Sequence, residues 1–218
     1  MTIKRIAILG AGGQAQEVAW LIRDINRERS AYDFLGYIVP DLSKLGMYDS
    51  TKDLLGDESW LAANQRSVDC LAIGIGSPSR RGSVADEMTG RYPNILWPAL
   101  IHPTAIFDKD TCEIGSGTMI CAGATCTIDI SFGPFVLVNF GCTIGHHVRM
   151  GRGCVVNPGA NISGGVVLGD EVLVGSGAQI LQYLRIGNGA VVGAGAVVLK
   201  DVAENCTVIG VPARPLSK

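Results

Sequence analysis

Apolar residues recur every six positions along the carboxyl-terminal half of the chain. Steps of six from Ile114 to Val198 meet an apolar side chain each time. With 47% of residues apolar, such a run has chance odds on the order of one in 10⁵. The positions are Ile114, Ile120, Cys126, Phe132, Val138, Ile144, Met150, Val156, Ile162, Leu168, Val174, Ile180, Ile186, Val192 and Val198.

A second pattern accompanies the first, because the fourth residue after the apolar position is usually small or β-branched. These residues are Ala124, Cys142, Val148, Cys154, Ala160, Val166, Val172, Ala178, Ala190 and Ala196. This period is typical of a parallel β-helix, in which each hexapeptide forms one flat strand and one turn and three hexapeptides close a triangular coil. About five coils follow from the number of repeats. A β-sandwich would instead alternate at period two and is disfavoured.

The first hundred residues alternate between apolar strands and helices. We expect strands at residues 4–9, 34–39 and 70–75, a helix after the first strand and a second helix at 57–64. This alternation predicts a parallel sheet. The fold class is therefore α/β plus all-β, with a small Rossmann-like domain at residues 1–100 and a β-helix at residues 101–218.

A glycine-rich segment follows the first strand and fits the pattern G-x-G-x-x-A from Gly10 to Ala15. Glycines there let the backbone approach a phosphate, and a helix amino terminus favours negative charge. A full dinucleotide fold needs two such halves, so one mononucleotide or nucleotide-sugar is favoured over NAD; a plain tight turn is the alternative. The expected substrate-binding residues are Gly10, Gly12, Gly13, Gln14, Asp41, Gly76 and Ser77, with a solvated turn as the alternative for Asp41.

Charge and cysteine content narrow the range of functions. Eighteen Lys and Arg stand against twenty Asp and Glu, a net charge of −2 that disfavours nucleic-acid binding. No run of about 20 mainly apolar residues predicts a membrane span. Seven cysteines lack a close C-x-x-C pair, so we expect free buried thiols in a cytoplasmic protein and no metal site.

Three histidines are the groups that titrate near neutral pH. His102 precedes the regular repeat, where we expect a linker role. His146 and His147 lie inside a hexapeptide, at a turn where side chains can leave the wall of the coil. The pair is therefore the candidate for general acid–base catalysis, with an ordinary surface pair as the alternative.

Several motifs together resemble one known family. They are Gly-Ala-Gly-Gly at 10–13, Ile-His-Pro-Thr-Ala at 101–105, the hexapeptides, Asn-Phe-Gly-Cys-Thr-Ile-Gly-His at 139–146 and Val-Ile-Gly-Val-Pro-Ala-Arg at 208–214. This set resembles the sialic-acid O-acetyltransferase and nucleotide-aminosugar N-acetyltransferase family. The resemblance implies a left-handed β-helix, a homotrimer with active sites between subunits, and acetyl transfer from acetyl-CoA to a sugar, commonly a UDP- or GDP-linked 4-amino sugar.

The same resemblance assigns roles to individual residues. His146 matches the general base, Asn139 matches a polar residue near the substrate, and Gly164 matches a backbone donor to the thioester oxygen. Acetyl-CoA is expected along a groove between two prisms, against Gly177, Ala178 and Ala194. Arg214 is expected to pair with the CoA phosphates, with a solvated terminal charge as its alternative.

The chain also departs from the family pattern. Family members usually have Asp or Glu directly after the catalytic histidine, where this chain has His147. They often have His at the position of Gln14, and an acidic cluster where this chain has Val39-Pro-Asp41. We therefore expect a catalytic role for His147 without a permanent negative charge, and the nucleotide stays open among UDP, GDP, dTDP and CMP.

The expected function is N-acetylation of a nucleotide-linked 4-amino sugar in bacterial surface-glycan synthesis. Three alternatives remain at this point. They are O-acetylation of a sialic-acid-like sugar, a non-catalytic nucleotide-sugar-binding protein, and a β-helical carbonic anhydrase. The last needs three histidines on zinc from neighbouring coils, which the adjacent pair does not supply.

Overall fold

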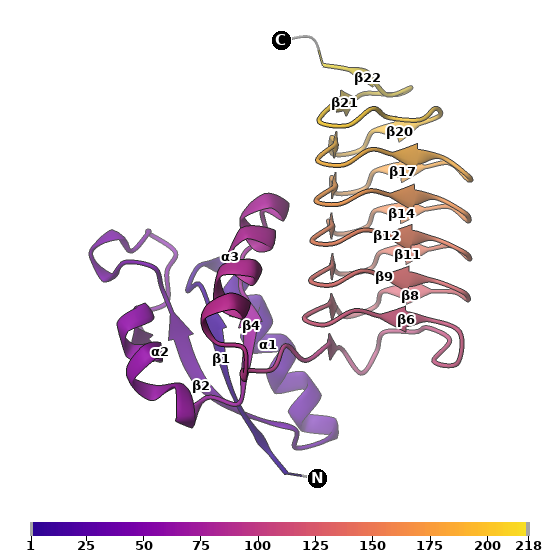
Figure 1. The fold of residues 1–218 in the computed structure, drawn as a ribbon. Coiled ribbons are helices and arrows are strands. Elements are labelled where there is room, and N and C mark those ends of the chain that lie inside the picture. Colours follow the sequence, from indigo (N-terminus) through magenta and orange to yellow (C-terminus); the bar gives the residue numbers. More distant parts are fainter. Residues whose placement is uncertain (1, 217–218) are drawn as a thin grey trace.

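The chain forms two parts that lie side by side, a small α/β domain and a long β-helix (Figure 1). The computed structural model describes residues 2–216. The α/β domain packs beside the coils that follow it directly in sequence, and the later coils extend beyond it (Figure 1). The predicted fold class, a parallel-sheet domain followed by a hexapeptide-repeat β-helix, is confirmed.

The α/β domain is built on a four-stranded parallel sheet with the order β3-β2-β1-β4. Its strands and helices are β1 (Lys4–Leu9), α1 (Gly13–Glu28), β2 (Tyr32–Ile38), β3 (Leu54–Gly56), α2 (Glu58–Asn64), β4 (Cys70–Ile73) and α3 (Pro78–Arg91). Helix α1 buries an apolar stripe that includes Val18, Ile22 and Ile25, which explains its clear signal in the sequence. The three predicted strands and the predicted helix at 57–64 are present; the bounds of the first strand are as predicted, and those of the others differ by one or two residues.

Two elements of this domain were not predicted. Strand β3 is three residues long and only half-buried. Helix α3 buries Arg81 and Gly82 beside Ala85 and Met88. Because a helix that buries an arginine and a glycine lacks a continuous apolar stripe, periodicity alone does not reveal it.

The β-helix consists of two-residue strands, and all but the first of them end at the apolar position of a hexapeptide. They are β5 (Leu100–Ile101), β6 (Glu113–Ile114), β7 (Met119–Ile120), β8 (Thr125–Cys126), β9 (Ser131–Phe132), β10 (Leu137–Val138), β11 (Thr143–Ile144), β12 (Arg149–Met150), β13 (Val155–Val156), β14 (Asn161–Ile162), β15 (Val167–Leu168), β16 (Leu173–Val174), β17 (Gln179–Ile180), β18 (Arg185–Ile186), β19 (Val191–Val192) and β20 (Val197–Val198). A three-residue strand β21 (Thr207–Ile209) and the antiparallel β22 (Arg214–Pro215) follow. The predicted six-residue register is confirmed from β6 to β20.

The strands stack into three parallel sheets, one for each face of the prism. We call them the first face (β7, β10, β13), the second face (β8, β11, β14) and the third face (β9, β12, β15). Partners such as Val138 and Val156 are one coil apart, and 156 − 138 gives 18 residues per coil. The hexapeptide residues fill the interior as one continuous apolar core, so neighbouring coils stabilise one another.

The α/β domain packs on the first face of the prism. Helix α1 shares an apolar cluster with Leu100, Met119, Leu137 and Val155, whose strands belong to that face. Polar contacts add to this packing, because Arg152 pairs with Asp86 of α3 at 2.6 Å. A triangular prism places the edge between its second and third faces opposite the first face. That edge therefore points away from the chain's own α/β domain.

Arg81 connects the two parts from a fully buried position. Its guanidinium donates hydrogen bonds to the carbonyl oxygens of Ile73, Ile75 and Phe135, each at 2.9 Å. Burial lowers the pKa of Arg81 to about 10, because a charged group loses its hydration in the interior. Arg81 therefore links the end of β4 to the turn between β9 and β10.

All seven cysteines are free thiols. Burial raises the pKa of both Cys121 and Cys154 to about 12, so these thiols stay protonated and unreactive near neutral pH. Within residues 2–216, no helix is long and apolar enough to cross a membrane.

Candidate active site

The histidine pair lies in the turn that follows β11, at the edge between the second and third faces. We call this edge the histidine corner. Both side chains are exposed. His147 has a positive φ of 60°, which turns its ring toward His146, and the two Nδ1 atoms are 3.0 Å apart. The rings meet edge to face with centroids 5.2 Å apart.

Gly164 lies one coil further along at the same corner, since 164 − 146 is 18. A Cβ at Gly164 would lie 2.6 Å from both Cε1 and Nε2 of His146. The ring of His146 therefore rests directly against the Gly164 backbone, and only glycine leaves room for it. The Gly164 N–H donates to no acceptor among the described residues, whereas its carbonyl oxygen accepts from the Tyr183 N–H at 3.0 Å.

This arrangement places a proton acceptor beside an available backbone donor. An imidazole nitrogen can remove a proton from a nucleophile, and a backbone N–H can hydrogen-bond to an oxyanion that forms next to it. Such an arrangement suits acyl transfer without a covalent enzyme intermediate. Within the described residues, no three His, Cys, Asp or Glu side chains come together as a metal site.

Asn139 does not join the pair within one chain. It lies at the edge between the first and second faces, a different corner of the prism, and its side chain is only 3% exposed. Its Nδ2 donates to Oδ1 of Asn157 at 3.3 Å. Within one chain this amide packs the corner, and the expected substrate contact of Asn139 stays a prediction.

The residues expected to contact acetyl-CoA are only partly on the surface. Gly177 has a positive φ of 67° with open space beside it, and Ala194 is exposed. Ala178 is fully buried in the interior, so the expectation for its side chain is corrected. Arg214 is exposed near the end of the β-helix, and its Nη1 donates to the Ala213 carbonyl oxygen at 2.9 Å.

The glycine-rich loop and the loop after β4 lie together at the carboxyl edge of the parallel sheet. A Cβ at Gly10 would lie 3.0 Å from the Gly74 carbonyl oxygen, and one at Gly76 would lie 3.5 Å from Oε1 of Gln14. Helices α1 and α3 begin at this edge with Gly12 and Ser77 as N-caps, and neither cap makes a side-chain hydrogen bond. Gly13 is the first residue of α1. Ligands of open α/β sheets bind at this edge, and uncapped helix amino termini suit an anion.

Two carboxylates, Asp41 and Asp49, limit which ligand groups can bind at this edge of the sheet. Asp41 is already engaged, since it accepts from Ser43 N and pairs with Lys44 at 2.8 Å, which lowers the pKa of Asp41. Asp49 was not singled out from the sequence. Its Oδ1 would lie 3.2 Å from a Cβ at Gly12. This negative charge favours a hydroxyl or N–H donor of a ligand over a phosphate at that point.

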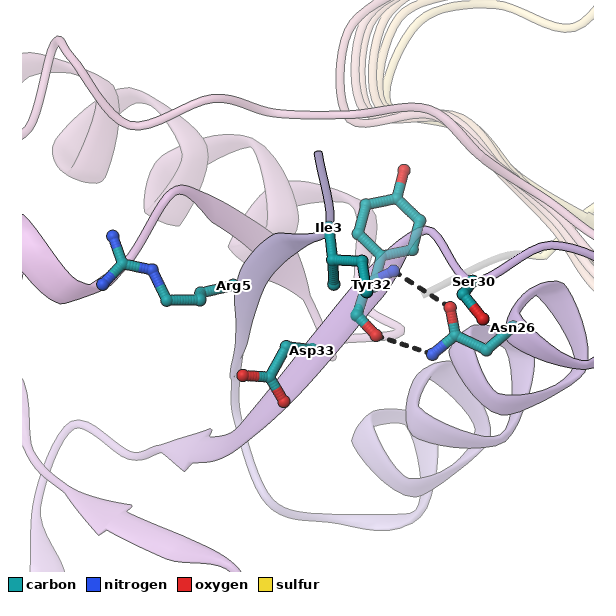
Figure 2. Close-up of a pocket in the computed structure, with 6 residues that line it drawn as sticks. All are labelled: Ile3, Arg5, Asn26, Ser30, Tyr32 and Asp33. Atoms are coloured by element: carbon teal, nitrogen blue, oxygen red, sulfur yellow. Dashed lines mark hydrogen bonds between the residues drawn. The ribbon is translucent and has the colours of Figure 1, made fainter. Parts of the chain in front are cut away.

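A hollow of about 440 Å³ opens elsewhere on the α/β domain, and it is not this site (Figure 2). It lies by Arg5 and Asp33, at the amino ends of β1 and β2, the opposite edge of the sheet. Asn26 closes one side by bonding to the main chain of Tyr32 (Figure 2). The residues that line this hollow connect α1 to β2 and stabilise the fold.

His102 is a structural residue of the junction. Its Nδ1 accepts from the Thr104 N–H at 3.1 Å, so its Nε2 carries the proton that faces Asp24 at 3.1 Å. These bonds join α1 to the first coil, which agrees with the predicted linker role.

Sequence reasoning missed Asp129 at the histidine corner. Its Oδ2 lies 3.6 Å from Nε2 of His147. The signal was present, because 147 − 129 is 18 and one coil therefore separates the two residues.

Comparisons with known proteins identify chains of similar fold. The family model of the bacterial transferase hexapeptide (six repeats) matches residues 165–200. A search of the curated proteins found no match. The chain is similar to a histidine-to-asparagine variant of perosamine N-acetyltransferase from Caulobacter crescentus in complex with CoA and GDP-perosamine, with 25% identity and a TM-score of 0.87, over 100% of this chain and 99% of that one.

Two further solved structures are similar over nearly their whole length. One is the acetyltransferase domain of PglB from Neisseria gonorrhoeae FA1090 in complex with acetyl coenzyme A, with 26% identity and a TM-score of 0.84, over 99% of this chain and 100% of that one. The other is WeeI from Acinetobacter baumannii AYE, with 28% identity and a TM-score of 0.80, over 99% and 100% of the two chains. The resemblance to the hexapeptide-repeat family of sialic-acid O-acetyltransferases and nucleotide-aminosugar N-acetyltransferases is thereby confirmed.

Proposed function

We propose that the protein transfers the acetyl group of acetyl-CoA to the amino group of a nucleotide-linked 4-amino sugar, with His146 as general base. The observation that carries the proposal is the contact between the His146 ring and the Gly164 backbone. It is supported by the similarity over the whole chain to an N-acetyltransferase in complex with CoA and GDP-perosamine.

In the proposed reaction the sugar amine attacks the thioester carbon. Nε2 of His146 takes a proton from the amine, a C–N bond forms, and the Gly164 N–H donates to the oxyanion. The C–S bond then breaks, and the proton returned by His146 leaves with the CoA thiolate as the free thiol. A general base of this kind contributes roughly 10² to 10⁴ in rate.

The proposed site needs a second copy of the chain. The glycine-rich loop belongs to the domain on the first face, whereas the histidine pair lies on the opposite edge of the prism. Exposed apolar side chains such as Ile128 and Leu181 lie on the turns of the histidine corner. We infer a homotrimer, since cyclic contacts between identical prisms would cover these side chains and bring the histidine corner to a neighbour's nucleotide domain.

Acetyl-CoA would lie in the groove between two prisms, where Gly177 and Ala194 leave the wall open. Arg214 would meet its phosphates. On the α/β domain, the loops at Gly10–Gln14 and Gly76–Ser77 would hold the nucleotide.

The test is release of free CoA thiol when the purified protein meets acetyl-CoA and UDP-, GDP-, dTDP- or CMP-linked 4-amino sugars. We expect turnover with one of these nucleotides, and mass spectrometry should show one added acetyl group on nitrogen. His146→Ala should lower kcat by roughly 10² or more and leave acetyl-CoA affinity nearly unchanged. Full activity of that variant would overturn the assigned base, and CoA release with an ester product would indicate O-acetylation.

A further inference from the structure

Four residues occupy one turn position on successive coils of the histidine corner. They are Asp129, His147, Gly165 and Tyr183, spaced 18 apart, and all have positive φ, at 54°, 60°, 71° and 63°. Backbone bonds hold the column in register: His147 N donates to Ile128 O at 3.1 Å, and Gly165 N donates to His146 O at 2.8 Å. The backbone of Asp129 is thereby held one coil from that of His147.

The contacts form a line from a carboxylate to the proposed base. His146 Nδ1 lies 3.0 Å from His147 Nδ1, a hydrogen-bond distance. His147 Nε2 lies 3.6 Å from Asp129 Oδ2, which is beyond a hydrogen bond but within the range of electrostatic attraction. His147 occupies the sequence position at which the carboxylate was expected, and Asp129 supplies a carboxylate behind it.

Only one proton fits between the two Nδ1 atoms. If Nε2 of His146 is to accept a proton, its Nδ1 must carry one and donate it to Nδ1 of His147. Neutral His147 then carries its own proton on Nε2, facing Asp129. The opposite pair of tautomers would protonate Nε2 of His146, blocking it as a base, and would aim the lone pair of His147 at a carboxylate.

We propose that Asp129 is a positioning residue, which acts through His147 to hold His146 in the tautomer with a free Nε2. The inference rests on the proposed function of His146 as general base. Asp129 also favours the imidazolium that forms when His146 takes up a proton, because its negative charge lies at the far end of the pair. The ordering of tautomers is a property of the resting protein and needs no substrate.

Other polar groups at the corner do not replace Asp129. The guanidinium of Arg149 donates to the carbonyl oxygens of Asp129 and Val148, so it carries positive charge toward the same turn. The ring of Tyr183 covers Gly165. Of the three described residues Asp129, Arg149 and Tyr183 at this corner, Asp129 is the one that carries a carboxylate.

The direct test is nitrogen-15 NMR of protein labelled at its three histidines, with assignment by His102→Gln, His146→Gln and His147→Gln. We expect Nδ1-protonated His146 in the wild type. Asp129→Asn should give a mixture with the Nε2-protonated form, which free imidazoles prefer. Asparagine tolerates positive φ, so the turn should survive. Asp33→Asn, an exposed aspartate of the α/β domain, is the control for loss of one charge.

Kinetics provide the second readout. Asp129→Asn should lower kcat about threefold to tenfold, as befits an exposed ion pair, and leave KM for acetyl-CoA unchanged. The acid limb of its pH–rate profile should move to lower pH, because a carboxylate favours the protonated ring. His147→Glu would supply a carboxylate directly, and Glu171 shows that this chain accommodates glutamate at a φ of 57°. In that background, Asp129→Asn should have little further effect.

The two proposals fail in different ways. An unchanged tautomer of His146 in Asp129→Asn would overturn the positioning role, whether or not acetyl transfer is found. Wild-type protein inactive with every sugar nucleotide would contradict the proposed function, while the NMR result would still decide the role of Asp129. The positioning role would also be overturned if Asp129→Asn lowered kcat equally in the wild type and in the His147→Glu background. Such a result would indicate that Asp129 does not act through His147.

Discussion

Replacing Gly164 by alanine should disable the site without unfolding the protein. The added Cβ would lie 2.6 Å from Cε1 and Nε2 of His146 and 3.0 Å from Cδ2, so the ring must move by about 1 Å to restore ordinary contact. The φ of Gly164 is not in the left-handed region, so the backbone accepts alanine. A misplacement of about 1 Å in a catalytic group costs on the order of 10²-fold in rate.

The assay compares kcat for acetyl transfer with the thermal unfolding of the same variant. We expect kcat to fall about 10²-fold while the free energy of unfolding changes by less than about 1 kcal/mol. Gly90→Ala is the matched control, because a Cβ at Gly90 in α3 meets no atom within 4 Å. Gly164→Ala with full kcat would refute the reasoning, since the position of the His146 ring would then not matter.

Three further predictions concern stability. Arg81→Met should lower the free energy of unfolding by about 3 kcal/mol or more, because three carbonyl oxygens lose their donor. An unchanged urea midpoint would show that Arg81 does not hold the two parts together. Deleting Gly169 should abolish cooperative unfolding of the β-helix, since it moves every later apolar position out of register, and a normal melting curve by circular dichroism would contradict the six-residue rule. The ion pair with Arg5 lowers the pKa of Asp69 from 3.8 to about 2, so its stabilisation is complete above about pH 4 and is lost as pH falls toward 2. Asp69→Asn should therefore lower the free energy of unfolding by about 1 kcal/mol at pH 7, because the pair is partly exposed to solvent. In unfolding measurements near pH 2, the variant and the wild type should be equally stable.

The β-helix could be predicted almost residue by residue because its core follows one short period. Each hexapeptide residue from Ile120 to Val198 is buried, and only Ile114 at the open end is half-exposed. The α/β domain was less predictable. Strand β1 is buried along most of its length and gives a strong signal, whereas α3 packs through Arg81, whose Nε and Nη1 donate to backbone carbonyl oxygens that no local pattern reveals.

The parts of the candidate site that could be predicted are those where the residue type itself indicates the chemistry, such as histidine for proton transfer. The histidine pair and Gly164 lie together as the resemblance implied. Ala178 was misjudged, because its side chain lies fully buried in the interior of the prism. Asp129 could have been found only by counting in whole coils of 18 residues. It is far from His147 in sequence but lies next to it along the column.

Mixed assemblies offer a test of where the complete site lies. Gly12→Asp should leave α1 intact, since aspartate is a favoured N-cap, but it adds a side chain and a second negative charge beside Asp49 and should exclude a nucleotide from the glycine-rich loop. If His146 of one subunit works with the nucleotide domain of another, co-assembled Gly12→Asp and His146→Ala chains should contain intact sites. Random mixing in equal amounts in a cyclic trimer gives about a quarter of wild-type activity, although each variant alone is nearly inactive. An active Gly12→Asp homo-oligomer would show that the glycine-rich loop does not hold the nucleotide. Tandem purification verifies that the two variants co-assemble. If each variant alone is inactive and the co-assembled mixture is also inactive, each chain builds its site alone.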